Sequence, residues 1–83
     1  MTTKVHIENL SPFATKESLI EAGSRFGFIR EVTIERTPEG MCKGVASITY
    51  STAEDAAQAA EGLNGCRIHN REMKASVAPA ADS

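Results

Sequence analysis

The sequence predicts an α+β fold with element order βαββαβ, in which a four-stranded antiparallel sheet carries two helices on one face. Apolar and polar residues alternate, as in strands with one buried face, over residues 4–9, 29–34, 43–50 and 71–78. After the first and third of these segments, apolar or small residues recur at helical spacing behind a Ser or Thr that can cap a helix. The 83 residues suffice for one small domain, 1–83, with its core at about 4–78.

The spacing of apolar residues changes from the two-residue period of a strand to that of a helix between the first strand and the first helix. Val5 and Ile7 are expected to point into the core from a strand at residues 4–9. Thr15 is a good N-cap for the helix that follows. This helix is expected to stop at Gly27, and its apolar stripe consists of Leu19, Ile20, Ala22 and Phe26.

The second and third strands are joined by a turn signal, the sequence Thr-Pro-Glu-Gly at residues 37–40. The second strand is expected to point Ile29, Val32 and Ile34 into the core. The third strand is expected at residues 43–50, with its inward side chains supplied by Ala46, Ile48 and Tyr50.

The second helix is expected to begin at Ser51 or Thr52 and to end within residues 62–65. Its small residues allow close contact with the sheet; they are Ala56, Ala57, Ala59 and Ala60. The last strand is expected at residues 71–78, with Met73, Ala75 and Val77 inward, before a frayed tail at 79–83. The complete order is that of the ferredoxin-like fold.

Two short motifs resemble the paired signature motifs of the RNA recognition motif (RRM) family. Residues 43–50 match the ends of the family octamer, which is a basic residue and Gly at the start and an aromatic residue at the end. Residues 5–10 match the family hexamer of aliphatic, aromatic, aliphatic, any, Asn and Leu. Three positions that are usually aromatic differ, because they hold His6, Val45 and Ser47. The resemblance covers nearly the whole chain and implies an RRM with incomplete stacking aromatics.

This resemblance implies that single-stranded RNA binds to the sheet face opposite the helices. Stacking of a base on an aromatic side chain contributes roughly 1–3 kcal/mol, so a face without such side chains is expected to bind RNA weakly. A basic rim is expected to contact phosphates, although the same residues suit ordinary solubilising charge. The predicted RNA-binding residues are His6, Lys43, Val45, Ser47, Arg71 and Lys74, with Arg36 and Arg67 also on the expected rim.

A protein ligand is the alternative. The net charge of −2 and pI near 5.6 argue against general electrostatic binding to nucleic acid. Phe13 and Phe28 have no place in the inward pattern, and Phe28 is a candidate anchor for a protein partner. RRMs that bind tryptophan-bearing peptides have an Arg-any-Phe loop, whereas the corresponding residues 66–68 here lack the Phe.

Residues 4–7 and 75–79 also resemble the RRM of the splicing-associated RNA-binding protein with serine-rich domain, which implies pre-mRNA processing, mRNA splicing and partner docking.

Other classes of function find little support in the sequence. Cys42 and Cys66 lack metal-ligand spacing and are expected to be free thiols in loops. Residues 11–15 lack the paired cysteines of small copper carriers of the same element order, and no anion loop of acyl-phosphate hydrolases is present. We therefore expect no metal, no cofactor and no catalytic residues. Without an apolar run of membrane-spanning length or a signal-peptide pattern, we expect an intracellular and preferably nuclear protein without membrane contact.

Overall fold

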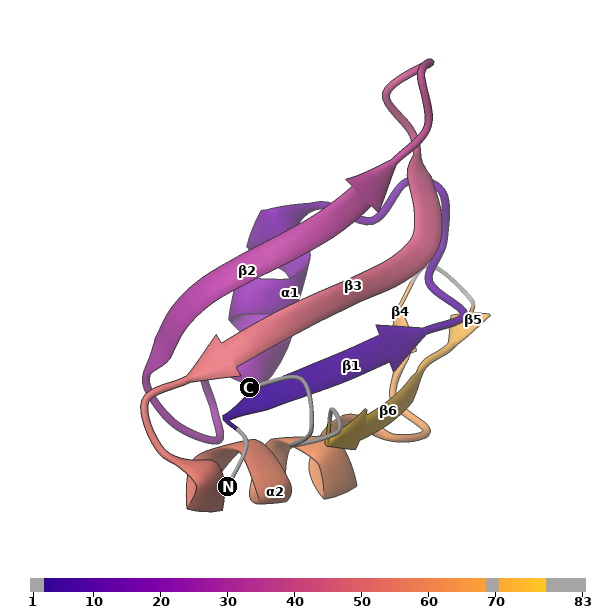
Figure 1. The fold of residues 1–83 in the computed structure, drawn as a ribbon. Helices are drawn as coiled ribbons and strands as arrows, with labels where there is room; N and C mark the ends of the chain where they lie inside the picture. Colours follow the sequence, from indigo (N-terminus) through magenta and orange to yellow (C-terminus); the bar gives the residue numbers. More distant parts are fainter. Residues whose placement is uncertain (1–2, 69–70, 78–83) are drawn as a thin grey trace.

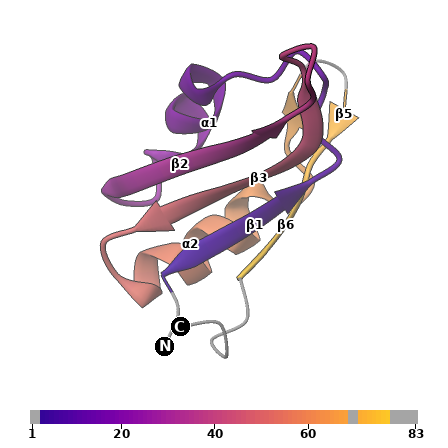
Figure 2. The same cartoon turned by 45° about the horizontal axis from the view of Figure 1, so that its top comes forward.

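The computed structural model of the chain describes residues 3–68 and 71–77. They form a sheet of strand order β2-β3-β1-β6, a separate two-stranded hairpin and two helices that cover one face of the sheet (Figures 1 and 2). The elements are β1 Lys4–Glu8, α1 Lys16–Gly23, β2 Ile29–Arg36, β3 Cys42–Tyr50, α2 Ala53–Leu63, β4 Arg67–Ile68, β5 Arg71–Glu72 and β6 Lys74–Val77. The arrangement confirms the predicted ferredoxin-like α+β fold.

Both helices begin where their caps predict. The Thr15 hydroxyl accepts a hydrogen bond from the backbone N–H of Ser18 at 3.2 Å, and the Thr52 hydroxyl accepts one from Asp55 at 3.1 Å. Each bond satisfies a donor that would otherwise lack a partner in the first helical turn. Of the two predicted caps for α2, the structure therefore selects Thr52.

The core lies between the sheet and the two helices. Both central strands supply it from the predicted positions, and α2, which contacts β6 and β1, buries Ala56, Ala59 and Ala60. The prediction for Ala57 was wrong, because this residue lies on the exposed side of the helix. In β2 an extra residue, Arg30, separates Ile29, which pairs with Tyr50, from Glu31, which pairs with Thr49. This bulge explains why Ile29 and Val32, three positions apart, both pack against the core. The buried side chains include Val5, Ile7, Leu19, Ile34, Ala46, Ile48, Tyr50, Ala56, Ala59, Leu63 and Met73.

The predicted end of the first helix was wrong. Helix α1 ends at Gly23 rather than at Gly27, and the N–H of the next residue, Ser24, closes the last turn on the carbonyl of Ile20. Ile20, predicted to point inward, is 44% exposed because the inward face is set by Leu19 and Gly23, one turn apart.

The predicted last strand was also wrong, because it is divided at Met73. Strand β5 pairs with β4, whereas β6 pairs with β1. Between them the N–H of Met73 donates to the carbonyl of Cys66 at 2.7 Å, and its carbonyl accepts from Gly65 at 2.8 Å. Val77, predicted to point inward, is 39% exposed at the end of the edge strand. The predicted strand end at 78 and tail at 79–83 lie outside the described residues.

The two cysteines are free, but only one lies in a loop. Cys66 precedes β4 and its thiol donates to the carbonyl of Gly62 at 3.2 Å. Cys42, predicted to lie in a loop, is the first residue of β3 and is buried in the core. Its sulfur accepts a hydrogen bond from the N–H of Gly44 at 3.3 Å. Cys42 thus has a packing role that its position beside a turn signal did not reveal.

Candidate nucleic-acid interface

The sheet face opposite the helices, here called the open face, has a row of polar residues across its middle. The strand register places Thr33 of β2 opposite Ser47 of β3, Ser47 opposite His6 of β1, and His6 opposite Ser76 of β6. The chain has one Tyr, three Phe and no Trp. Tyr50 points into the core and the phenylalanines lie outside the strands, so the described part of the open face has no aromatic ring except the imidazole of His6.

Two of the predicted RNA-binding residues, His6 and Ser47, line a shallow hollow in the middle of this face. Thr33, Glu35 and Ala46 complete its lining. The imidazole offers a ring of moderate area for stacking, and the neighbouring hydroxyls offer hydrogen bonds to base edges. The carboxylate of Glu35 disfavours a phosphate here, so the hollow suits a base better than the RNA backbone.

A second hollow lies where β1 ends and β3 begins, and it contains three further predicted residues, Lys43, Val45 and Arg71. We call it the basic hollow. Its two cations can contact phosphate, although the carboxylate of Glu8 lies in the same lining. The remaining lining residues are Asn9, Leu10, Pro12, Cys42 and Gly44.

The backbone of Gly44 shapes the basic hollow. Its φ of +96° is in the region that glycine adopts without the steric cost of a Cβ. Its carbonyl accepts the N–H of Leu10 at 3.0 Å, which holds the end of β1 against β3. Lys43 and Val45, two positions apart in β3, lie on the same face by strand alternation, and Gly44 between them lines the hollow with its backbone.

Asn9 positions the arginine of this hollow. Its φ of +63° is unusual for a residue other than glycine, and Asn tolerates it better than most. The side-chain amide donates to the carbonyl of Glu72 at 2.7 Å, and its oxygen accepts from the Arg71 guanidinium at 3.5 Å. Asn9 thus links the end of β1 to β5 and holds Arg71 at the edge of the open face.

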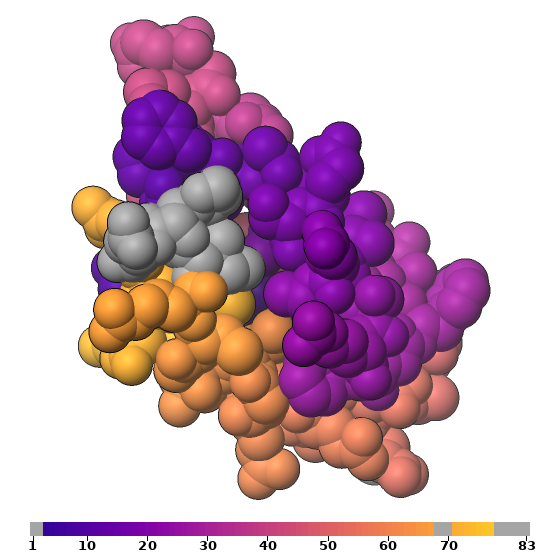
Figure 3. All heavy atoms as spheres, turned by 180° about the vertical axis from the view of Figure 1, so that it is seen from behind, coloured from indigo at the N-terminus to yellow at the C-terminus, as the bar shows by residue number. Residues whose placement is uncertain are grey.

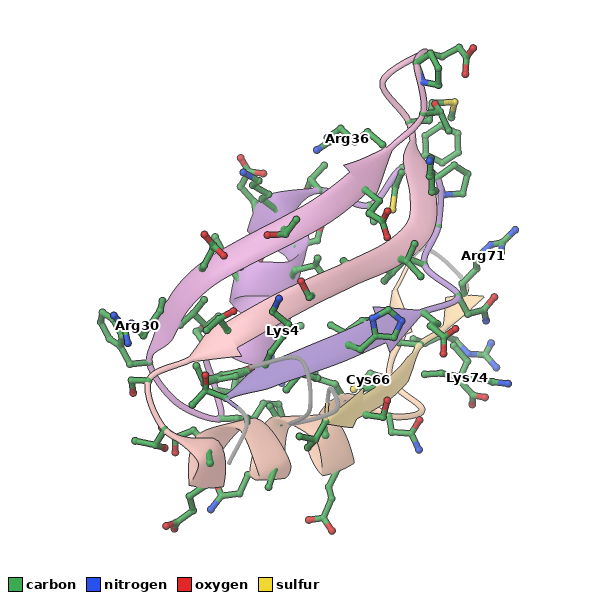
Figure 4. The ribbon with its side chains drawn as sticks, in the orientation of Figure 1. Lys4, Arg30, Arg36, Cys66, Arg71 and Lys74 are labelled. Carbon is green, nitrogen blue, oxygen red and sulfur yellow. The ribbon has the colours of Figure 1, made fainter. Side chains whose placement is uncertain are left out.

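The basic rim is smaller than predicted. Lys74 lies opposite Glu8 in the register, and Figure 4 shows it near Arg71 at the same edge of the sheet. Arg67 instead lines a hollow on the helical face together with Arg25, so its predicted place on the rim was wrong. Arg36 binds the carbonyl of Gly40 in the β2–β3 turn at 3.1 Å. The β4–β5 hairpin separates Arg67 from Arg71, and this separation had no local signal in the sequence.

Phe28, the predicted anchor for a protein, is 74% exposed in the connection between α1 and β2. Its carbonyl accepts the N–H of Ser51 at 3.0 Å, which places it beside the end of β3. An apolar ring with this exposure is available to a partner. Phe13 is similarly exposed, at 69%, in the loop between β1 and α1.

No set of three or more His, Cys, Asp or Glu side chains within residues 3–68 and 71–77 is arranged to bind a metal ion. Neither helix in the described ranges has the length and apolar character needed to cross a membrane.

Comparison with known proteins matches residues 5–74 to the sequence pattern of the family described as RNA recognition motif. The chain is 33% identical over 70 residues to polyadenylate-binding protein 2 of Arabidopsis thaliana, and 37% identical over 71 residues to the cytoplasmic and nuclear polyadenylate-binding protein of Candida glabrata. These matches cover 84% and 86% of the chain, but only 11% and 12% of the two relatives. The chain therefore corresponds to a small part of each of these proteins.

Similar solved structures are RNA recognition domains. RNA recognition domains 1 and 2 of Sex-lethal from Drosophila melanogaster superimpose with a TM-score of 0.86 at 25% identity, covering 95% of this chain and 51% of that chain. The RRM of RNA15 with bound GU RNA gives a TM-score of 0.88 at 24% identity, covering 100% and 89%. At 24% identity, the likeness to the RNA15 structure is evidence for the fold alone.

Proposed function

The chain belongs to the RNA recognition motif family, and from this premise we propose that its open face binds single-stranded RNA with low affinity. The family consists of RNA-binding modules rather than enzymes. The observation that carries the proposal is the polar row of Thr33, Ser47, His6 and Ser76, which occupies the middle of the open face without a Phe, Tyr or Trp.

The magnitude of stacking supports weak binding. Each base stacked on an aromatic side chain contributes roughly 1–3 kcal/mol, and a tenfold change in affinity corresponds to about 1.4 kcal/mol. Val45 and Ser47 stand at two stacking positions of the octamer and His6 at one of the hexamer. Replacing the rings at two or three positions therefore moves a typical micromolar complex toward the millimolar range. His6 recovers part of this loss.

Phosphate contacts are assigned to Lys43, Arg71 and Lys74 at one edge of the open face. Such contacts position the RNA and contribute affinity that falls with salt, but they carry little sequence preference. The proximity of Glu8 to Lys74 and Arg71 reduces the positive potential of this edge. This reduction also favours low affinity.

The relatives support RNA as the ligand class. Two of them are named polyadenylate-binding proteins, and the Sex-lethal structure at 25% identity consists of domains named for RNA recognition. We further propose that the domain acts within a larger protein in nuclear RNA processing, including mRNA splicing. This part rests on the sequence resemblance to a splicing-associated RRM.

Backbone amide NMR during titration with short single-stranded RNA pools tests the proposed function. We expect shifts at His6, Thr33 and Ser47 in fast exchange, with a dissociation constant between high micromolar and millimolar. Nanomolar binding would contradict the low-affinity part. Shifts confined to α1 and α2, or no shift at millimolar RNA, would contradict binding at the open face.

Protein docking is the second candidate function, and the exposed ring of Phe28 favours it. Glu17 and Glu21 are exposed on the neighbouring helix α1. Together with Phe28 they would suit a partner that combines an apolar side chain with basic residues. This function predicts that a partner shifts amides of the helical face and leaves His6 and Ser47 unchanged.

A further inference from the structure

We propose that a base of the bound RNA stacks on Phe13, in the loop between β1 and α1, while the adjacent phosphate occupies the basic hollow. This inference rests on the proposed function and adds a contact outside the sheet. The stacking surface, here called the loop platform, comprises Phe13 and the neighbouring Met41. It would replace part of the stacking that the open face lacks.

The loop platform joins two segments that are distant in sequence. The N–H of Cys42 donates to the carbonyl of Pro12 at 3.0 Å. Phe13 follows Pro12 and Met41 precedes Cys42, so both belong to segments that are joined by this hydrogen bond. Figure 3 shows the loop after β1 (indigo) lying against the β2–β3 turn (pink). Phe13 is 69% exposed and Met41 is 38% exposed, so both offer apolar surface at this end of the molecule.

The backbone that presents Phe13 is held in a defined turn. Ser11 is buried, and its hydroxyl accepts the N–H of Phe13 at 3.1 Å. Its carbonyl accepts the N–H of Ala14 at 3.0 Å. A ring that is exposed on a fixed backbone loses less conformational entropy on binding than a ring on a mobile loop.

The segment that carries Met41 is also closed by hydrogen bonds. The N–H of Thr37 donates to the carbonyl of Met41 at 2.7 Å, and the Thr37 hydroxyl accepts the Met41 N–H at 3.2 Å. The guanidinium of Arg36 binds the carbonyl of Gly40 at 3.1 Å. Both halves of the loop platform therefore have fixed backbones before RNA arrives.

The charges beside the loop platform favour a nucleotide. Pro12, which directly precedes Phe13, lines the basic hollow together with Lys43 and Arg71. The hollow also contains the carboxylate of Glu8, which leaves two cations against one anion. An exposed ring next to this excess of positive charge matches the alternation of base and phosphate along a single strand. Phe28 has the opposite environment, because the preceding residue Gly27 faces the carboxylate of Asp55. Phe28 is therefore a matched control: a similarly exposed Phe beside a negative charge.

Single-tryptophan variants test the proposal directly, because the chain has no Trp of its own. Phe13→Trp and Phe28→Trp are titrated with single-stranded RNA of about ten nucleotides, a length within the usual site size of single-strand binders. We expect saturable quenching of the fluorescence of Phe13→Trp, since a stacked base contacts the indole. The fluorescence of Phe28→Trp should not change.

Affinity measurements complete the test. Phe13→Ala is expected to weaken RNA binding by roughly five- to twentyfold, the lower part of the range for one stacked base, and Phe28→Ala by less than twofold. Both rings are exposed, and circular dichroism should show both variants folded.

The outcomes separate this inference from the proposed function. Unchanged affinity of Phe13→Ala, with RNA still shifting the His6 and Ser47 amides, would overturn the loop platform and leave the proposed function intact. Absence of RNA binding by the wild-type chain would overturn both. Quenching in Phe13→Trp without shifts at His6 and Ser47 would support the loop platform and contradict binding at the open face.

Discussion

The phenol of Tyr50, at the end of β3, donates a 2.7 Å hydrogen bond to the carbonyl of Gly23, the last residue of α1. Tyr50 is fully buried, and a Cβ placed on Gly23 would lie 2.6 Å from its hydroxyl. The absence of a side chain at Gly23 thus lets the helix end approach the sheet. The final aromatic residue of the octamer therefore joins helix to sheet and is not available to RNA.

Removal of this hydroxyl should destabilise the domain. In Tyr50→Phe the carbonyl of Gly23 loses its donor in a buried site, which costs roughly 1–3 kcal/mol of the free energy of unfolding. Urea denaturation followed by circular dichroism measures the loss. A variant as stable as the wild type would mean that the bond contributes no net stability.

The same residue predicts alkaline sensitivity. Burial, assisted by the nearby carboxylate of Asp55, raises the pKa of Tyr50 from 10.0 to about 12. The unfolded chain therefore releases this proton at lower pH than the folded chain. The stabilising contribution is complete below pH 10 and declines as the pH rises to about 12, by roughly 2–3 kcal/mol in total.

The alkaline effect is measured as the difference between wild type and Tyr50→Phe, because other titrating groups are common to both. Urea midpoints between pH 8 and pH 11 should fall more steeply for the wild type above pH 10. Parallel curves would show that Tyr50 titrates similarly in the folded and unfolded states.

Restoring aromatic residues to the octamer should strengthen RNA binding. Val45→Phe combined with Ser47→Tyr adds two stacking surfaces on the open face, and at least a tenfold gain in affinity is expected at roughly 1–3 kcal/mol per stacked base. Gln58→Phe, on the exposed side of α2, is the control for nonspecific gain from added aromatic area. NMR titration measures both; no gain in a folded double variant would exclude the open face as the RNA site.

The basic rim predicts a change in salt dependence. Replacing Lys43, Arg71 and Lys74 by Ala should lower the slope of log affinity against log salt by about 2, since each phosphate contact on a single strand contributes about 0.7. Sequence preference should change little. Fluorescence anisotropy at several salt concentrations measures the slope.

A control with equal loss of charge separates rim contacts from net charge. Lys16, Arg25 and Arg67 lie away from the open face, on α1 or in the hollow of the helical face. Their combined replacement by Ala should leave the salt slope nearly unchanged. Equal effects of the two triple variants would argue against a localised rim.

The protein-docking alternative predicts a specific effect of Phe28→Ala. Because this ring is 74% exposed, its removal should leave the urea midpoint almost unchanged. It should weaken a complex with a protein partner by roughly 1–3 kcal/mol, the range of an aromatic anchor. Calorimetry measures the affinity. An unfolded variant would show that Phe28 has a structural role, and an unchanged complex would remove it from the interface.

Much of the fold followed from local patterns in the sequence. The two-residue period of apolar and polar residues predicted that Val5 and Ile7 lie in the core, because neighbouring side chains of a strand point to opposite faces. Thr15 and Thr52 predicted the helix starts, because an N-cap acts on backbone groups only two or three residues away. The polar character of the open face followed from the same alternation.

Tertiary structure alone decided the features that depend on which backbone and side-chain groups meet in the folded chain. The hydrogen bond from Tyr50 to Gly23 joins the end of α1 to β3. The hydrogen bonds of Met73 with Cys66 and Gly65 divide the last strand. Asn9 holds Arg71 at the rim through side-chain contacts between residues more than sixty positions apart in sequence. Periodicity carries no information about such pairs, because it describes which face a side chain occupies and not which backbone group lies opposite. The separation of Arg67 from Arg71, and the meeting of the loops that carry Phe13 and Met41, were therefore determined by the path of the folded chain.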